Sequence, residues 1–398
     1  MHPPRTGTAG EVFATFLRLG LTSFGGPIAH VGYFRREIVE RRGWVREEQF
    51  AELLGLCQFT PGPASSKLGF SLGLLRAGWP GALAAFAGFT IPSALLLFAF
   101  AVLLPDIPAS AAQVLVHGLK LVAVAVVAHA LVGMARRLCP DAIRASIAAG
   151  CALAILAIGG PWVQLAAVLA GALAGLAWCR GMAAAPHETP RLPHGRGTGV
   201  ALLAIFALLL VLLPLAASAL DGRVAVASAF YRAGALVFGG GHVVLPLLQE
   251  TVVAPGWIAP DEFLAGYGAA QAIPGPMFSL ATFLGARLAG GMGGAAGAIT
   301  ALVSIFLPGL LLIAGVLPLW DAIAKHPRTV SAVAGINAAV VGLLAAAFYD
   351  PVWTSAVGSA LDAGIAIVGF AMLAAWRLPP LAVVAWCIAA AAVRAAFA

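Results

Sequence analysis

The sequence contains little charge and few acidic residues. Only 10% of its 398 residues are charged, 16 being Asp or Glu, whereas 61% are hydrophobic and the mean hydropathy is +0.98. Soluble domains do not have this composition, so we predict an all-α polytopic membrane protein in a lipid bilayer. The apolar runs hold almost no Asp or Glu, which argues against a carboxylate proton relay or a carboxylate-lined sodium site.

Several chemical motifs are also missing. The chain has no HExxH, no Walker loop, no GxSxG and no pair of membrane aspartates, so it gives no support to an enzyme or an ATP-driven pump. Its five cysteines are scattered without CxxC spacing, and we expect no metal, no cofactor and no disulfide framework. The net charge of +7 is modest and its arginines lie in loops, which indicates membrane topology rather than nucleic-acid binding. A secretory signal is lacking, so we expect the N-terminus to be retained.

What the chain does contain is a Pro-Gly-Pro triplet at 61–63, inside about 25 mostly apolar residues, and a second one at 274–276. Proline lacks an N–H and clashes with the preceding turn, so neither segment can be one continuous helix. The second proline suits the first position of a new helix, which would leave free amides at Ala64 and Ser65. Such amides form an anion site, and broken backbone survives in lipid only where protein buries it or it lines a cavity.

The two triplets belong to an internal duplication. The segment from Arg18 to Gly26 matches that from Arg232 to Gly240 (232 − 18 = 214), and Gln271 answers Gln58 (271 − 58 = 213). Several unusual residues recur in register, which is a strong sign of a repeat. We predict an N-terminal repeat at 1–180, a polar linker plus connecting transmembrane helix at 181–225, and a C-terminal repeat at 226–398.

The basic residues predict that the two repeats have inverted topology. Loop 35–49 is rich in arginine whereas its counterpart 250–262 has no Lys or Arg, and the bias also inverts at 105–112 against 318–330 and at 136–144 against 350–355. With the basic loops in the cytoplasm, the N-terminus is cytoplasmic and 50–75 is a re-entrant hairpin, whose tip meets that of 262–286 near the midplane. A kinked full crossing is the alternative, and the same two alternatives apply to 12–34.

The residues around the two tips suit a small oxyanion. Backbone amides, serine hydroxyls and Lys67 supply donors and one full positive charge, whereas Leu280 stands in place of the lysine in the second half. In the structural alternative, the prolines only kink two helices and Lys67 reaches toward an interface. The candidate substrate-binding residues are Ser23, Gly25, Gly26, Gln58, Thr60, Gly62, Ala64, Ser65, Ser66, Lys67, Gly239, Gly240, Gly241, His242, Gln271, Gly275, Met277 and Ser279.

Four further residues are candidates for the transport pathway. Arg18 and Arg232 occupy matching places in apolar segments, where an arginine either has a partner or lies at a helix end near the headgroups. Lys120 and Asn337 are expected at the starts of corresponding helices, where they would line the path. The histidines in apolar segments could relay protons, although hydrogen-bonded structural roles are the simpler alternative.

These motifs resemble those of the chromate ion transporters, in particular the long, two-domain type. The resemblance rests on Phe-Gly-Gly-Pro at 24–27, the basic loop ending at Trp44, Gln-x-x-Pro-Gly-Pro at 58–63 and their second-half equivalents, and it covers essentially the whole chain. It implies transport of chromate, in bacteria usually outward through the inner membrane as a resistance mechanism, with sulfate as a chemically similar competitor. Lys67 and the second-half Gly-Gly-Gly-His at 239–242 are less firmly part of the family pattern.

The physics agrees with outward transport of a dianion. Moving two negative charges out of a negative interior releases about 4.6 kcal/mol per 100 mV, twice about 2.3 per elementary charge. Export therefore needs neither ATP nor, in principle, a proton. A sulfate or other oxyanion carrier is the alternative, followed by a membrane enzyme or scaffold acting on anionic lipid. The sequence leaves open the oligomeric state, including a homodimer, and the coupling ion.

Overall fold

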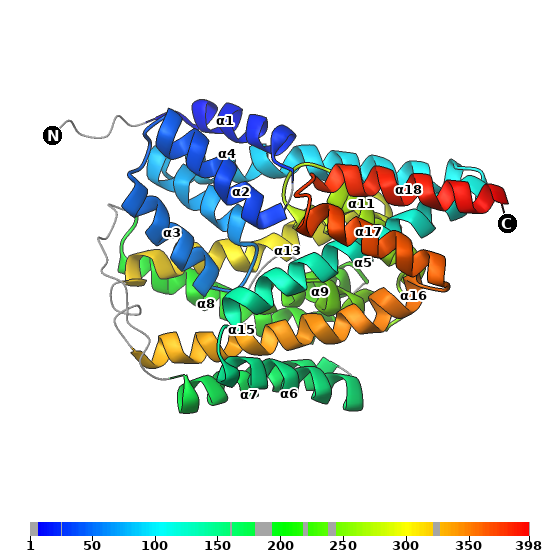
Figure 1. Cartoon of the computed structure of the whole chain (residues 1–398). Coiled ribbons are helices and arrows are strands. Elements are labelled where there is room, and N and C mark those ends of the chain that lie inside the picture. Colours follow the sequence, from blue (N-terminus) through cyan, green and yellow to red (C-terminus); the bar gives the residue numbers. More distant parts are fainter. Residues whose placement is uncertain are drawn as a thin grey trace.

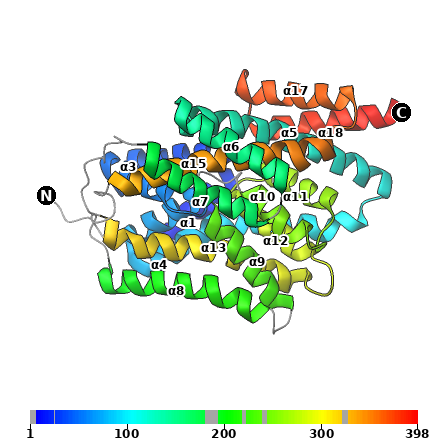
Figure 2. The same cartoon turned by 90° about the horizontal axis from the view of Figure 1, so that it is seen from below.

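The computed structural model describes residues 7–24, 26–159, 161–179, 193–217, 222–237, 244–320 and 327–397. Within these ranges all regular secondary structure is helical, without a strand, and the helices pack side by side (Figures 1 and 2). The predicted all-helical fold is therefore confirmed.

The helices follow the apolar runs of the sequence. The first part of the chain holds α1 (Ala9–Thr22), α2 (Gly26–Phe34) with a π-helical continuation (Arg35–Arg41), α3 (Glu47–Phe59), α4 (Ala64–Leu103), α5 (Ala109–Leu138), α6 (Ala142–Ile158) and α7 (Pro161–Trp178). Then follow α8 (Arg196–Ala217), α9 (Gly222–Leu236), α10 (Val244–Leu248) with a second π-helical stretch (Gln249–Val253), α11 (Pro260–Ala272), α12 (Leu280–Arg287) and α13 (Gly294–Val316). The chain ends with α15 (Pro327–Ala347), α16 (Thr354–Ala356), α17 (Ala360–Ala374) and α18 (Pro380–Phe397).

One prediction about helix starts is wrong. Lys120 and Asn337 were expected at the beginnings of their helices, but α5 starts at Ala109 and α15 at Pro327. Both residues therefore lie about three turns inside. Helix α5 includes residues 109–112 (Ala-Ser-Ala-Ala) because alanine is the strongest helix former. Pro108, directly before them, is the last residue of the preceding loop.

The long helix α4 reverses direction near its middle. Ala77 and Gly78 have non-helical backbone angles, with Gly78 at φ +64°, a left-handed conformation that glycine tolerates best. The two arms then touch: a Cβ added to Gly73 would lie 2.4 Å from the carbonyl oxygen of Gly81. Residues 64–76 and 79–103 are thus two arms of a tight helical hairpin, whose turn directly follows Arg76.

The chain also reverses at both Pro-Gly-Pro triplets. We call residues 60–63 the first break and residues 273–276 the second break. Across the first, Lys67 of α4 donates a hydrogen bond to Thr60 at the end of α3. Across the second, Glu262 of α11 pairs with Arg287 of α12, and a Cβ on Gly266 would meet the Phe283 ring. Residues equally far before and after the second break are neighbours, so α11 and α12 are antiparallel, as the hairpin alternative requires. At the first break, the start of α4 contacts the end of α3.

Helices from the two ends of the chain exchange packing partners. Helix α5 lies against α17 and α18, and its Gly118 allows the backbone of Ile388 to approach (Figure 2). Helix α15 lies against α6 and α7, where Gly335 contacts Gly171 and Gly175 backbone to backbone. Small residues permit such close approach in membrane helices, so Gly171 and Gly175 serve helix packing.

A buried ion cluster fixes the α5–α17–α18 group. The Asp362 carboxylate, near the start of α17, has a side chain that is 1% exposed. It accepts hydrogen bonds from His117 of α5 at 2.8 Å, from Ser359 at 2.9 Å and from Arg394 of α18. Because each partner comes from a different part of the group, the cluster holds the three helices in one register.

The surface of the bundle identifies a membrane protein. Among the described residues, five helical stretches are long and apolar enough to cross a bilayer: Ala64–Asp106, Ser110–Leu138, Arg196–Ala217, Gly294–Leu319 and Val330–Ala356. Large apolar side chains on the outside, such as Leu95, Ile158 and Leu173, are more than half exposed. An aqueous surface of this kind would be unfavourable, so the chain is a multi-pass membrane protein, as predicted.

The arginine-rich loop at 35–49 is partly neutralised by its own glutamates. Arg35 pairs with Glu40 and Glu47, while Arg41 and Arg42 both hold Glu37. Partial burial raises the pKa of Glu37, but the hydrogen bonds from Arg42 and Arg41 outweigh it and hold that pKa below its ordinary value. The loop is therefore a structured, charged element at one end of the bundle.

Candidate functional site

The two breaks have the same backbone shape. Gly62 and Gly275 both have φ +103°, a conformation that L side chains rarely adopt. Space is short as well: a Cβ on Gly62 would lie 2.8 Å from the Cα of Gly309, and one on Gly275 would lie 2.9 Å from the Ser93 hydroxyl. Each break thus requires glycine for two reasons: its backbone conformation, and its close contact with a long helix, which is α13 at the first break and α4 at the second.

Each break is hydrogen bonded to the other half of the chain. The Gly62 amide donates to the Val237 carbonyl at 2.7 Å, and the Gly275 amide donates to the Ser23 carbonyl at 3.0 Å. Both acceptors directly precede a Phe-Gly-Gly motif, and they are 214 residues apart (237 − 23), the spacing of the duplicated Arg18 and Arg232. The two bonds are therefore equivalent and crossed, so that each half supplies the acceptor for the break of the other.

A buried histidine connects the two breaks. His30, fully buried on α2, places Nε2 3.2 Å from the Ser23 carbonyl that also accepts from Gly275, and Nδ1 3.3 Å from the Ser65 hydroxyl. Since a carbonyl can only accept, the ring proton is on Nε2 and Nδ1 accepts from Ser65. Ser65 lies in the first turn of α4, directly after the first break. The chain from Gly275 through Ser23 and His30 to Ser65 therefore links both tips.

Lys67 is wholly buried behind the first break. Its Nζ donates to the Thr60 carbonyl at 2.5 Å, the Thr60 hydroxyl at 2.9 Å and the Pro61 carbonyl at 2.9 Å. These acceptors lie at the end of α3, where carbonyls lack helical partners and the helix dipole is negative. All three ammonium protons are thus used within the hairpin, so the lysine adds positive charge to the break without a free N–H for a direct ligand.

Serine hydroxyls surround the breaks unequally. Ser279 donates to the Ser93 hydroxyl at 2.7 Å, because Ser93 itself donates to the Thr90 carbonyl at 2.9 Å. In the equivalent place of the first half, the buried Ser66 hydroxyl has no hydrogen-bond partner among the described residues (279 − 66 = 213). The same holds for the buried Ser23 hydroxyl. Buried donors without partners suit a polar ligand or water at this centre.

The two glutamines that precede the breaks have different surroundings. Gln58, in the last turn of α3, is exposed. Gln271, in the last turn of α11, is 8% exposed, and its amide nitrogen lies 3.0 Å from the Met277 sulfur. Ala64 and Ser65 open α4, as predicted for residues that carry helix-terminal amides.

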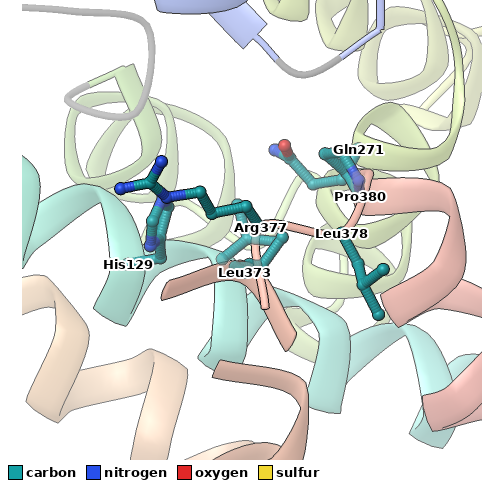
Figure 3. Close-up of a pocket in the computed structure, with 7 residues that line it drawn as sticks. His129, Gln271, Leu373, Arg377, Leu378 and Pro380 are labelled. Carbon is teal, nitrogen blue, oxygen red and sulfur yellow. The ribbon is translucent and has the colours of Figure 1, made fainter. Parts of the chain in front are cut away.

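Gln271 also faces a pocket of about 230 Å³ (Figure 3). The pocket lies between α5, the end of α11 and the turn joining α17 to α18. Its basic side chains are His129 and Arg377, neither of which was singled out from the sequence for this place. The lining residues are Val126, His129, Gln271, Leu373, Arg377, Leu378 and Pro380.

The remaining predicted residues are spread more widely. Arg18 of α1 and Arg232 of α9 are exposed, so the structure does not bring them to the breaks. Lys120 forms an ion pair with Asp261 at 2.7 Å, and the buried Asn337 oxygen has no partner among the described residues. Gly26 is described, with φ +74°, whereas Gly25 and the segment with Gly239, Gly240, Gly241 and His242 lie outside the described residues. Within the described ranges, no group of three or more His, Cys, Asp or Glu side chains could hold a metal ion.

These features define a class of protein: a multi-pass helical membrane protein whose broken hairpins meet at a buried polar centre, as in ion carriers. A family model described as "Chromate transporter" matches residues 10–176 and 224–393. The chain belongs to the chromate transporter family, which confirms the resemblance seen in the sequence and the prediction of a transporter rather than an enzyme.

Individual relatives match over nearly the whole chain. The chromate transport protein of Pseudomonas aeruginosa is 30% identical over 376 residues, which cover 92% of this chain and 87% of the relative. The probable chromate transport protein of Synechococcus elongatus is 30% identical over 358 residues, covering 83% and 81%. An uncharacterized transporter of Methanocaldococcus jannaschii is 25% identical over 348 residues, covering 85% and 83%. No solved structure matches this chain.

Proposed function

We propose that this protein exports the chromate dianion from the bacterial cytoplasm across the inner membrane and thereby gives chromate resistance. The observation that carries the proposal is the crossed pair of bonds from Gly62 to Val237 and from Gly275 to Ser23, with unpaired buried hydroxyls beside them. Backbone amides, hydroxyls and the charge of Lys67 suit a tetrahedral dianion. The named functions of the Pseudomonas and Synechococcus relatives agree with chromate as substrate.

The substrate site would comprise the residues at the two breaks. The unpaired hydroxyls of Ser23 and Ser66 would donate to oxygen atoms of the anion, and Lys67 would act through its charge. The other members of the proposed site are Gly25, Gly26, Gln58, Thr60, Gly62, Ala64, Ser65, Gly239, Gly240, Gly241, His242, Gln271, Gly275, Met277 and Ser279.

An inverted repeat would place this site between two similar halves. Three observations support it: the order of helices recurs from α1 to α7 and from α9 to α18, the π-helical stretches start 214 residues apart (249 − 35), and the bonds at the breaks are crossed. The arginine-rich loop 35–49 and Arg136 and Arg137 at the end of α5 favour a cytoplasmic location for these ends, and with them a cytoplasmic N-terminus. A homodimer stays a prediction.

Export would be driven by the membrane potential. A dianion leaving a negative interior releases about 4.6 kcal/mol per 100 mV. Chromate efflux from preloaded proteoliposomes tests this: we expect it to accelerate when an inside-negative potential is imposed, with protein-free vesicles as the control. Flux that ignores the potential and follows only a pH gradient would contradict the proposal that the potential alone suffices.

Sulfate is the second candidate, because hydroxyl and amide donors recognise the shape and charge that the two dianions share. Competition between labelled sulfate and chromate on the purified protein distinguishes the two. Chromate export predicts that chromate displaces sulfate at a lower concentration than sulfate displaces chromate.

A further inference from the structure

The pocket beside Gln271 has a counterpart between α6 and α15, and only one of the two is basic. Val126 and His129 in the first pocket answer Leu343 and Ala346 in a second pocket of about 210 Å³ (343 − 126 = 346 − 129 = 217). The second pocket is lined instead by Glu250 and Asp350. No carboxylate lines the pocket beside Gln271. The charge of this pocket is therefore not a consequence of the shared backbone frame.

Arg377 has a backbone conformation that its residue type does not favour. Its φ is +53°, the one positive value outside glycine in the described residues, and it lies in the turn after α17, three residues beyond the last helical residue Ala374. In the first half, α6 ends at Gly159 in the same left-handed region, φ +69°. A positive φ favours glycine, so an arginine in this turn carries backbone strain. It forms no ion pair with any described residue.

The position of Arg377 gives a second reason to expect a ligand. Leu373 of α17 lies at the same depth in the bundle as Val126 of α5. Both residues line the pocket, and Gly369, one turn before Leu373, packs on Ala125, the residue before Val126. From His129, α5 continues for nine residues to Leu138, about 13 Å. Its last turn carries Arg136 and Arg137. The pocket thus lies about 13 Å from that end of α5, and Arg377, which lines it, is exposed, so its guanidinium is accessible to an anion that enters.

We infer that Arg377, His129 and Gln271 form an oxyanion-binding site on the cytoplasmic approach to the second break. The inference rests on the proposed function, since the side to which the pocket opens follows from the proposed topology. The guanidinium fork matches two oxygens of a tetrahedral anion. The Gln271 amide, one N–H of which lies toward Met277, offers its other N–H to the same anion, directly before the second break.

Equilibrium binding of chromate, and separately of sulfate, to the full-length protein in lipid nanodiscs tests this site. Arg377→Gly is the decisive variant, because glycine removes the side chain and also relieves the left-handed backbone. We expect its unfolding temperature to equal or exceed that of the wild type, while the Kd for the anion rises about 10- to 100-fold through lost charge-assisted bonds. Arg136→Gln, which removes an equal charge from an exposed position, should bind within about twofold of the wild type.

The outcomes separate this site from the proposed function. If Arg377→Gly binds both anions like the wild type, the site is refuted, while wild-type chromate flux in vesicles still supports the function. If Arg377→Gly unfolds earlier than the wild type, Arg377 has a structural role and the inference is wrong. If the wild type neither binds nor moves either anion, the proposed function fails and the site fails with it.

A different observation concerns the outer faces of α3 and α11, which are equivalent but unequally covered. On α3 the residues Glu48, Ala51, Gly55 and Gln58 form one exposed stripe. On α11 the matching stripe, 213 residues later, is covered from Leu264 onward: Leu264 is 0% exposed and a Cβ on Gly268 would lie 2.2 Å from the Leu119 carbonyl of α5. At the same position on α3, Gly55 has no described atom within 4 Å of its added Cβ.

The polar side chains next to these two helix faces also differ in their partners. Lys120 of α5 closes the covered side with its ion pair to Asp261. The equivalents on the uncovered side are Asn337 of α15 (120 + 217) and Glu48 of α3 (261 − 213). Glu48 and Asp261 are both exposed, so the difference lies in their partners: Lys120 pairs with Asp261, whereas the Asn337 side-chain oxygen is buried without a partner among the described residues.

We propose that these two faces are the gates of an alternating-access carrier: α11 on α5 is the closed outer gate and α3 against α15 is the open inner gate. Closing the inner gate would bring Gly55 to Ile336 and Glu48 to the Asn337 amide, while α11 leaves α5 and the Lys120–Asp261 pair opens. This proposal also rests on the inverted repeat of the proposed function.

Gly55→Leu tests the inner gate, because the described structure has open space at that position. The variant should fold and bind chromate like the wild type, yet its flux in vesicles should fall at least tenfold. Gly150→Leu is the matched control, since Gly150 is an exposed helical glycine, also without a described atom within 4 Å, on α6. Flux by Gly55→Leu equal to that of Gly150→Leu would refute the gate.

A reversible lock provides a second measurement that does not depend on Gly55. In Lys120→Cys/Asp261→Cys, oxidation should join α5 to α11 and stop the flux, and a reductant should restore it. Full cross-linking with undiminished flux would overturn the outer gate. Wild-type flux of chromate or sulfate, recorded in the same vesicles, shows separately whether the proposed function holds.

Discussion

Lys67 gives the most direct test of how the first break acts on an anion. The perturbation is Lys67→Met, which keeps the length of the side chain and removes its charge. The fold should survive, because Leu280 stands at the equivalent position of the second hairpin (67 + 213) and Gly275 there has the same φ, +103°, as Gly62. A lysine is therefore not required for the backbone shape of a break.

The magnitude follows from two opposing terms. Hydrogen bonds to a charged group contribute roughly 1.5–3 kcal/mol each, but burial of the ammonium costs several kcal/mol, so the net change in stability should stay within about 2 kcal/mol. The effect on an anion is larger. A dianion about 8 Å from Nζ, at an effective dielectric constant of about 20, is stabilised by about 4 kcal/mol, close to a thousandfold in affinity. The carbonyl dipoles that hold the ammonium reduce this, so we expect about 100- to 1000-fold.

Two assays on the same purified protein separate these terms. Thermal unfolding in detergent should change by only a few degrees, and the Kd for chromate, measured by equilibrium binding in nanodiscs, should rise by at least 100-fold. A Lys67→Met protein that folds and binds chromate within threefold of the wild type would refute the reasoning. The lysine would then only satisfy the carbonyls at the end of α3, and binding would depend on the amides and hydroxyls alone.

Three other changes test the frame around the breaks. Gly275→Leu should abolish chromate flux in vesicles, because its Cβ would lie 2.9 Å from Ser93 at φ +103°, whereas Gly150→Leu should keep most of it. His30→Leu should leave the Ser65 hydroxyl unpaired and lower flux about tenfold or more with a smaller loss of thermal stability, since one buried hydrogen bond contributes about 1–3 kcal/mol. Asp362→Ala should destabilise the protein by about 3–5 kcal/mol, seen as a markedly lower unfolding temperature, because Arg394 loses its buried partner; unchanged stability would show that the cluster does not hold α5, α17 and α18 together.

The positions of the breaks could be predicted from the sequence because proline and glycine act locally. A missing N–H and a left-handed glycine determine the backbone wherever they stand, so α3 ends at Phe59 and α4 begins at Ala64 as the triplet indicates. The internal duplication could also be predicted from the sequence, since its detection requires only that similar residues recur at a constant spacing.

The partners of the breaks could not be predicted because they come from distant parts of the chain. Nothing in the local sequence says that Lys67 turns back to Thr60, or that Ser279 meets Ser93, 186 residues away. Arg377 left one usable signal. Gly159 follows α6 in the first half, and Arg377 takes its place in the turn after α17, a difference that appears once the halves are aligned through their final helices.

The similar frame and the unlike charges of the two halves have separate consequences. If each half supplies the acceptor for the break of the other, neither hairpin can move without changing a bond to its counterpart, which couples the two gates. The charges differ, since Lys67 answers Leu280 and Arg377 answers Gly159. A passive carrier cannot take its direction from such differences, because the net flux depends only on the concentrations and the potential. What the unequal charges can set is the affinity on each side. A basic pocket next to the second break would let the carrier fill at low cytoplasmic chromate, while the membrane potential supplies the driving force for release outside.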